Sequence, residues 1–218
     1  MPKNIVCKLT GFVGAGVKAH IIPRSFYGLD GESAKIFEID GVRDLEKRSP
    51  IGEYDPEIVT EEGERYFSDW DDYAAELLVQ RGHPVTVYTA GTETVCLEFG
   101  EYDYAKLKLF YMSLLWRADV TNRQLFRKVR LGPHQERLRQ HILDGDPGTA
   151  EDYSVIIGIH RDTPDAGHQF FEPHRYKDSI DGINGYSFSL GGHQAQIKVD
   201  RRPSPEGVRD SSLARRTR

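Results

Sequence analysis

Cysteine is scarce in this chain. Its 218 residues include 2 cysteines, Cys7 and Cys96, which lie far apart and form no CxxC pair. Small disulfide-stabilised domains depend on many cysteines, so this scarcity excludes a disulfide scaffold. It favours a reducing compartment, and we therefore expect a cytoplasmic protein.

Long apolar runs and internal repeats are missing as well. No stretch approaches the roughly 20 apolar residues of a membrane-spanning helix, and the N-terminal residues lack the apolar core of a signal peptide. These features argue against a membrane protein. The lack of a fixed repeat period argues against solenoid and propeller architectures.

The chain also lacks an excess of positive charge. The formal net charge is -5, which excludes a protein that coats nucleic acid through bulk electrostatics. Contact with DNA or RNA therefore requires a local basic patch. The C-terminal region offers one in six arginines: Arg201, Arg202, Arg209, Arg215, Arg216 and Arg218.

The composition that remains is that of a globular protein with its own core. Hydrophobic residues make up 38% of the chain and charged residues 29%. Two segments differ in pattern, and they predict an α+β protein with a small module over residues 1–82 and a larger α+β domain over residues 83–203. Residues 204–218 read as an Arg-rich tail.

Turns organise the first segment. The glycines that follow Cys7 let the chain reverse sharply, which predicts a short hairpin or knuckle. Pro23 favours an extended Ile22 and so places His20 on or beside a short strand. Further along, the apolar residues of 69–78 have helical spacing, and Ser68 or Asp69 could cap that helix.

The second segment combines helices with hairpins. Helical periodicity predicts a core helix from Tyr104 to about Asp119 and a second helix over residues 132–143. Alternating β-formers predict two hairpins, over residues 85–99 and 186–199, and a central strand over residues 153–159. Residues 162–183 read as a loop.

Several motifs of the chain resemble those of bacterial HNH-type endonucleases. The first segment holds three: Cys7-x-x-Thr10, Ala19-His20-Ile-Ile-Pro23 and Tyr54-Asp55-x-x-Ile58. In that family a CxxC pair precedes Ser-His-Ile-Ile-Pro, and a second CxxC follows a Tyr-Asp-x-Asn-Ile-Leu stretch. The resemblance implies a treble-clef, or ββα, module and metal-dependent hydrolysis of nucleic-acid phosphodiesters, for instance in defence against foreign DNA.

The chain departs from the family at the zinc ligands. The resemblance places the four family cysteines at Cys7, Thr10, Thr60 and Gly63, so one thiolate remains. A hydroxyl is a poor zinc ligand and glycine offers none, so we expect no structural zinc. Cys7 could alternatively join a histidine from the later chain in a different site. Aromatic residues are expected to hold the knuckle instead: Phe12, Phe26, Tyr66, Phe67 and Trp70.

The catalytic pattern is altered too. By the resemblance, His20 would be the general base that deprotonates the attacking water. Ala19 replaces a frequent metal ligand, whereas Glu57 and Glu64 stand where an asparagine and a histidine are expected. Because hard cations prefer oxygen ligands, Glu57 and Glu64 are the candidate ligands of a Mg²⁺ or Mn²⁺ ion.

Each of these residues also has a purely structural interpretation. An imidazole in a turn can simply hydrogen-bond the backbone, and the glutamates around position 62 can be a solvated surface. The carboxylates of residues 69–72 can stabilise a helix start without a metal. The basic residues between 123 and 139 could contact phosphate or be offset by neighbouring acids.

Two functions follow, and they belong to different classes. In the first, the chain is an HNH-like endonuclease that uses His20, Glu57, Glu64 and a divalent metal to cut DNA. In the second, the module has lost its chemistry and serves as a nucleic-acid-binding or protein-binding subunit of a larger complex. The retained His20 favours the first hypothesis and Ala19 favours the second.

Overall fold

The computed structural model describes residues 3–27, 37–40, 45–48, 52–80, 85–90, 93–159, 169–177, 182–190 and 192–204. Within these residues three α-helices combine with small, mainly antiparallel sheets, which confirms the α+β class. Outside the described residues lie the predicted Arg-rich tail beyond residue 204, the side chain of Cys96, and two of the later histidines, His160 and His168. None of the described helices is long and apolar enough to cross a membrane.

Helices α1 and α2 begin after residues whose side chains satisfy free backbone N–H groups. Helix α1 (Glu61–Ala75) is capped by Thr60 and continues into a π-helical stretch, Glu76–Gln80. Helix α2 (Tyr104–Val120) is capped by Asp103, and helix α3 (His134–Asp144) ends at Gly145, whose φ of 62° suits glycine. Two short 3₁₀ turns, Arg24–Tyr27 and Gln124–Phe126, complete the helical elements.

The predictions for α2 and α3 are confirmed, whereas the start predicted for α1 is wrong. The helix begins at Glu61, eight residues before Asp69. Its first turn carries three glutamates, Glu61, Glu62 and Glu64, and carboxylates are stabilised at the positive end of a helix dipole. The glutamates read as a solvated turn are therefore the first turn of the helix.

The other regular elements of the described chain are strands that form small sheets. The N-terminal hairpin pairs β1 (Asn4–Val6) with β2 (Val13–Ala15), and β3 (Ala19–His20) pairs with β6 (Tyr54–Asp55). A second hairpin pairs β7 (Val85–Ala90) with β8 (Glu93–Phe99), as predicted. A three-stranded sheet has the order β10 (Gln169–Phe171), β4 (Phe37–Asp40), β5 (Leu45–Arg48).

The largest sheet differs from the sequence prediction in two respects. Its order is β11 (His174–Lys177), β12 (Asn184–Leu190), β13 (His193–Lys198), β9 (Val155–Ile159), so β9 is an edge strand and not a central one. The predicted loop over residues 162–183 contains β10 and β11. The hairpin of β12 and β13 is confirmed.

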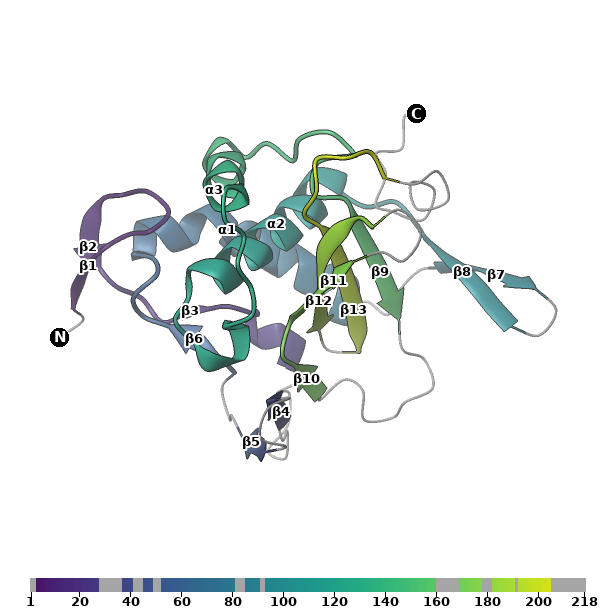
Figure 1. Cartoon of the computed structure of the whole chain (residues 1–218), viewed down its shortest axis with the longest axis horizontal. Coiled ribbons are helices and arrows are strands. Elements are labelled where there is room, and N and C mark those ends of the chain that lie inside the picture. Colours follow the sequence, from purple (N-terminus) through teal and green to yellow (C-terminus); the bar gives the residue numbers. More distant parts are fainter. Residues whose placement is uncertain are drawn as a thin grey trace.

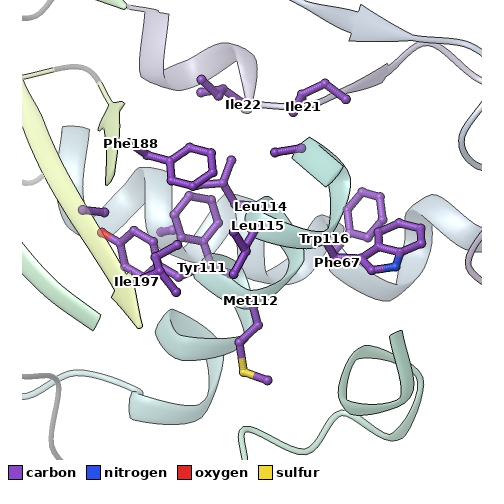
Figure 2. Close-up of a cluster of buried hydrophobic side chains, with 14 of the residues drawn as sticks. Ile21, Ile22, Phe67, Tyr111, Met112, Leu114, Leu115, Trp116, Phe188 and Ile197 are labelled. Carbon is purple, nitrogen blue, oxygen red and sulfur yellow. The ribbon is translucent and has the colours of Figure 1, made fainter. Parts of the chain in front are cut away.

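Helix α2 is the centre of the core. Nearly all of its residues are buried, because α1 and α3 pack against it together with the four-stranded sheet (Figure 1). Figure 2 shows Tyr111 of α2 near Phe188 and Ile197 of the sheet, and Trp116 of α2 near Phe67 of α1; all five are buried. The buried cluster runs from Cys7 to Ile197 and so includes members of both predicted segments.

The aromatic residues expected to hold the knuckle behave in two ways. Phe26 and Phe67 are buried, and Trp70 packs partly buried against the core. The prediction is wrong for Phe12 and Tyr66, which are 65% and 37% exposed. Apolar burial on the inner side of the knuckle is supplied by Cys7 and Leu9 instead.

Candidate functional site

The four positions that match the family's zinc cysteines meet in space. Cys7 and Thr10 lie on the turn that leads out of β1, and Thr60 and Gly63 lie at the start of α1. The backbone N–H of Thr10 donates to the Cys7 sulfur at 3.5 Å. A Cβ atom added at Gly63 would lie 2.5 Å from the same sulfur. The turn and the start of the helix therefore both pack against the Cys7 thiol.

The hydrogen bonds around this thiol set its acidity. Burial raises the pKa of Cys7, but hydrogen bonds from Thr10, Thr60 and Leu9 outweigh burial and leave the pKa lowered. Thr60 also caps α1, because its hydroxyl accepts from the backbone N–H of Gly63 at 3.4 Å. Packing and hydrogen bonds thus hold the two halves of the knuckle together in this structure.

His20 lies on the strand pair that follows the hairpin. It pairs with Tyr54 across β3 and β6, and their ring centroids are 6.1 Å apart. The His20 side chain is half-buried, whereas neighbouring Ala19 is fully buried and faces the core. This alternation follows from the strand geometry, in which successive side chains point to opposite faces.

Asp55 anchors the end of this strand pair to the residues that follow α2. Its carboxylate accepts from the Thr121 hydroxyl at 2.7 Å and from the backbone N–H groups of Asn122 and Glu57 at 3.3 and 2.9 Å. Burial raises the pKa of Asp55, but these hydrogen bonds and the charge of Arg123 lower it overall. The carboxylate is therefore engaged in structural contacts.

A buried ion pair ties His20 to both helices. Arg117 of α2 donates to the His20 carbonyl at 3.0 Å and to both carboxylate oxygens of Asp71 on α1, at 2.8 and 2.7 Å. Its guanidinium also lies 4.4 Å from the centre of the Phe67 ring. Sequence reasoning missed this pair. Arg117 follows Phe110 and Leu114 at helical spacing, which is the pattern of a buried face.

The two glutamates proposed as metal ligands lie in different surroundings. Glu57 is exposed, and its carboxylate is 3.3 Å from the Lys3 ammonium. Glu64 is partly buried in the first turn of α1. Burial raises its pKa, as do Asp71 and Glu61, whereas Arg117 acts against this rise. Glu64 thus faces the Arg117–Asp71 pair, and Glu57 faces the N-terminal segment.

This arrangement does not fit a divalent metal ion. His20, Glu57 and Glu64 are all described, yet across the described residues no three His, Cys, Asp or Glu side chains are grouped so that they could hold a metal. Among the described residues, Cys7 and the later histidines form no such group either. The cation that lies between β3 and α1 is the Arg117 guanidinium.

Sequence reasoning missed the positive charge around Tyr54. The Lys18 ammonium lies 5.3 Å from the centre of the Tyr54 ring, and the Arg123 guanidinium lies 5.5 Å from it. Lys18 is exposed, and Tyr54 and Arg123 are half-buried. Since His20 pairs directly with Tyr54, two cations and a second ring are grouped around Tyr54. We call this cluster the Tyr54 face: Lys18, His20, Tyr54 and Arg123.

Four other cations among the basic residues 123–139, the stretch that also contains Arg123, form ion pairs with acidic residues. Arg137 contacts Asp152, Arg139 contacts Glu136, and Arg127 and Lys128 both contact Glu172. These ion pairs favour the interpretation of offset surface charge over a phosphate-binding face. The guanidinium of Arg139 additionally donates to the Leu9 carbonyl at 2.6 Å and so braces the knuckle.

Comparison of the chain with protein-family models, with curated proteins and with solved structures gives no match.

Proposed function

We propose that the chain binds nucleic acid, DNA in particular, through the Tyr54 face of an HNH-like module, and that it acts as a binding subunit of a larger complex. The observation that carries the proposal is the aromatic ring of Tyr54 flanked by Lys18 and Arg123. Cations contact the phosphates of a nucleic acid, and an aromatic ring offers a surface for a sugar or a base.

The order of elements supports the HNH-like part of the proposal. A hairpin with Cys7 at its turn precedes the strand pair of His20 and Tyr54, and a helix follows whose first turn returns to Cys7. A treble-clef module joins a knuckle, a strand pair and a helix in this same order. The likeness rests on this order and on the motifs of the chain.

Binding is favoured over hydrolysis because of the surroundings of His20. Glu57 is engaged by Lys3, and Glu64 faces a buried arginine that is already neutralised by Asp71. Across the described residues, these side chains form no metal-holding group. A face that keeps its cations without such a group can hold a phosphate backbone, which requires positive charge and shape only.

Phosphodiester hydrolysis is the second candidate, and one observation favours it. His20 keeps a half-buried position, and its backbone carbonyl is fixed by Arg117. A histidine held in this way could accept a proton from an attacking water. The Mg²⁺ or Mn²⁺ ion expected from the resemblance would require Glu57 and Glu64 to leave their present partners.

The binding proposal is tested with fluorescently labelled DNA at several salt concentrations. The Lys18→Ala/Arg123→Ala variant should bind about tenfold more weakly or worse, and the slope of log K against log salt should fall by roughly one per lost phosphate contact. Lys106→Ala is the matched control, because Lys106 lies 5.8 Å from the Tyr73 ring in a comparable pair elsewhere. Equal losses in both variants would contradict the proposal.

A nuclease assay with Mg²⁺ or Mn²⁺ separates the two candidates. Wild-type protein that leaves DNA intact, as His20→Ala also does, supports the binding function. Cleavage by the wild type that disappears in His20→Ala would establish the enzyme instead. Cleavage that survives His20→Ala would remove the role of His20 as general base.

A further inference from the structure

The N-terminal hairpin exposes an unusual amount of apolar surface. Val6, Phe12 and Val13 are 61%, 65% and 71% exposed, and together with Tyr66 they are the large exposed hydrophobic side chains found among the described residues. Val6 and Val13 are direct partners across β1 and β2. Three apolar side chains are therefore gathered on one small element that extends from the left side of the molecule in Figure 1.

This hairpin is held in place on its inner side. The Cys7 N–H donates to the Phe12 carbonyl at 2.9 Å, and the Lys8 N–H donates to the Ile58 carbonyl at 2.8 Å. Cys7 and Leu9 are fully buried, and Arg139 of α3 donates to the Leu9 carbonyl. A rigid element that presents apolar side chains loses little conformational entropy when it binds a partner.

The charge around the hairpin identifies the kind of partner. Residues 1–27 contain four cations and no aspartate or glutamate, in a chain whose net charge is -5. Lys3 is paired with Glu57 and the Lys8 ammonium donates to the Val120 carbonyl, whereas Lys18 and Arg24 are exposed. A partner that matches both this charge and the exposed apolar side chains is a polyanion with flat apolar faces. The unstacked bases of a nucleic acid have such faces beside their phosphates.

The hairpin also leads directly into the Tyr54 face. β2 ends at Ala15, Gly16 bridges to Thr60, and Lys18 precedes β3. Lys18 thus lies between the apolar hairpin and the ring of Tyr54. In Figure 1 the chain leads from the pair β1–β2 at the left to β3 and β6, which are drawn below α1 and α3.

We propose that the β1–β2 hairpin inserts Phe12 against an unpaired base of the nucleic acid whose phosphates lie on the Tyr54 face. This inference rests on the proposed function and adds the structure that is recognised, a strand with an unstacked base. Val6 and Val13 add exposed apolar surface to the same hairpin, and apolar side chains of other proteins enter between base steps in this way. The protein should therefore prefer single-stranded or bulged DNA to a perfect duplex.

The preference is tested with three DNA probes of equal length: a single strand, a duplex with one unpaired 2-aminopurine, and a perfect duplex. Wild-type protein should bind the first two at least about tenfold more tightly than the third and should change the fluorescence of the unpaired base on binding. Phe12→Ala should lose most of this preference, and Phe12→Trp should restore it. Tyr66→Ala is the control, because Tyr66 is an exposed aromatic residue outside the hairpin.

The outcomes separate this inference from the proposed function. Phe12→Ala could bind all three probes as the wild type does, while Lys18→Ala/Arg123→Ala loses affinity. In that case the proposed insertion of Phe12 is wrong, and the proposed binding of nucleic acid at the Tyr54 face is kept. If the wild type binds no DNA, both fail. Binding of the hairpin to anionic lipid vesicles in place of DNA, abolished by Phe12→Ala, would also overturn the inference. Circular dichroism of each variant confirms that the fold is kept.

Discussion

Cys7 illustrates how one side chain can join a turn to the start of a helix. Its sulfur accepts from the Thr10 N–H and lies close to Gly63, in the first turn of α1. Because glycine has no Cβ, the helix start can approach the sulfur until they are in contact. The glycine at position 63 and the close approach of the helix therefore depend on each other.

Gly63→Ala should destabilise the protein by about 1–3 kcal/mol, the usual cost of overpacking. The added methyl group would lie 2.5 Å from the Cys7 sulfur and 3.1 Å from the Val59 Cβ. Urea denaturation measures the change in the free energy of unfolding. Gly158→Ala is the control, since a Cβ there would meet its nearest atom at 3.8 Å. A Cys7→Ala background should reduce the cost of Gly63→Ala, and full additivity of the two would contradict this explanation.

Asp71→Ala should cost about 3–5 kcal/mol of unfolding free energy, because it leaves a buried guanidinium without its partner. The Arg117 side chain is 1% exposed and that of Asp71 is 15% exposed. Replacing both, as Arg117→Met/Asp71→Ala, should recover part of the loss, since no uncompensated charge remains. Thermal and urea unfolding of the two variants measure the difference. A double variant less stable than Asp71→Ala would show that Arg117 stabilises the fold through its other contacts, with Phe67 and the His20 carbonyl.

Among the larger elements, those with strong local patterns were predicted and those that depend on distant partners were not. Helix α2 follows from its apolar spacing, and the hairpins follow from alternation around short turns. Strands β10 and β11 pair with β4 and β12, and no residue near them in sequence reveals that pairing. The start of α1 was missed because its first turn is made of glutamates, whose charge resembles that of a surface loop.

The candidate site was also predictable only in part. The motif around His20 located the strand pair, because Pro23 restricts the residue before it. The cations around Tyr54 were not foreseen, since Lys18 and Arg123 are far apart in sequence and meet only through the fold. The partners of Glu57 and Glu64 were hidden for the same reason.

The knuckle offers a direct test of the HNH-like proposal. A chain with Thr10→Cys, Thr60→Cys and Gly63→Cys should bind one Zn²⁺ through four thiolates, because these positions already surround Cys7. Co²⁺ substitution should give the visible absorption of a tetrahedral thiolate site, and Zn²⁺ should raise the melting temperature. The same variant with Cys7→Ser is the control and should bind the metal more weakly. A folded variant that takes up no Zn²⁺ would argue against the treble-clef arrangement.

At the scale of the whole molecule, hydrogen bonds and an ion pair join the loop after α3 to the end of the four-stranded sheet. The Glu151 carboxylate accepts from the buried Lys198 ammonium at 3.0 Å and from the Ser204 N–H at 2.8 Å. Burial raises the pKa of Glu151, but the hydrogen bonds from Ser204 and Lys198 outweigh it and lower the pKa to about 2. Since the folded pKa lies below the ordinary value near 4.5, the carboxylate stabilises the fold above that pH.

This stabilisation should be lost as the pH falls from about 4.5 to about 2. The unfolding free energies of the wild type and of Glu151→Gln should differ by about 1 kcal/mol at neutral pH, because Glu151 is partly exposed and its charge is screened. The difference should shrink through that window. Urea denaturation at a series of pH values measures it. A difference that stays constant down to pH 2 would contradict the assignment.

The buried contact between Arg117 and the His20 carbonyl also has a consequence for cooperativity. It links a strand of the N-terminal segment to the central helix, and the hydrophobic cluster continues across the same boundary. A unit that shares its core with a neighbour cannot melt while the neighbour stays folded. Calorimetry should therefore show no separate unfolding transition for the segments on either side of the boundary near residue 82. The two segments should unfold in one transition whose calorimetric and van't Hoff enthalpies agree.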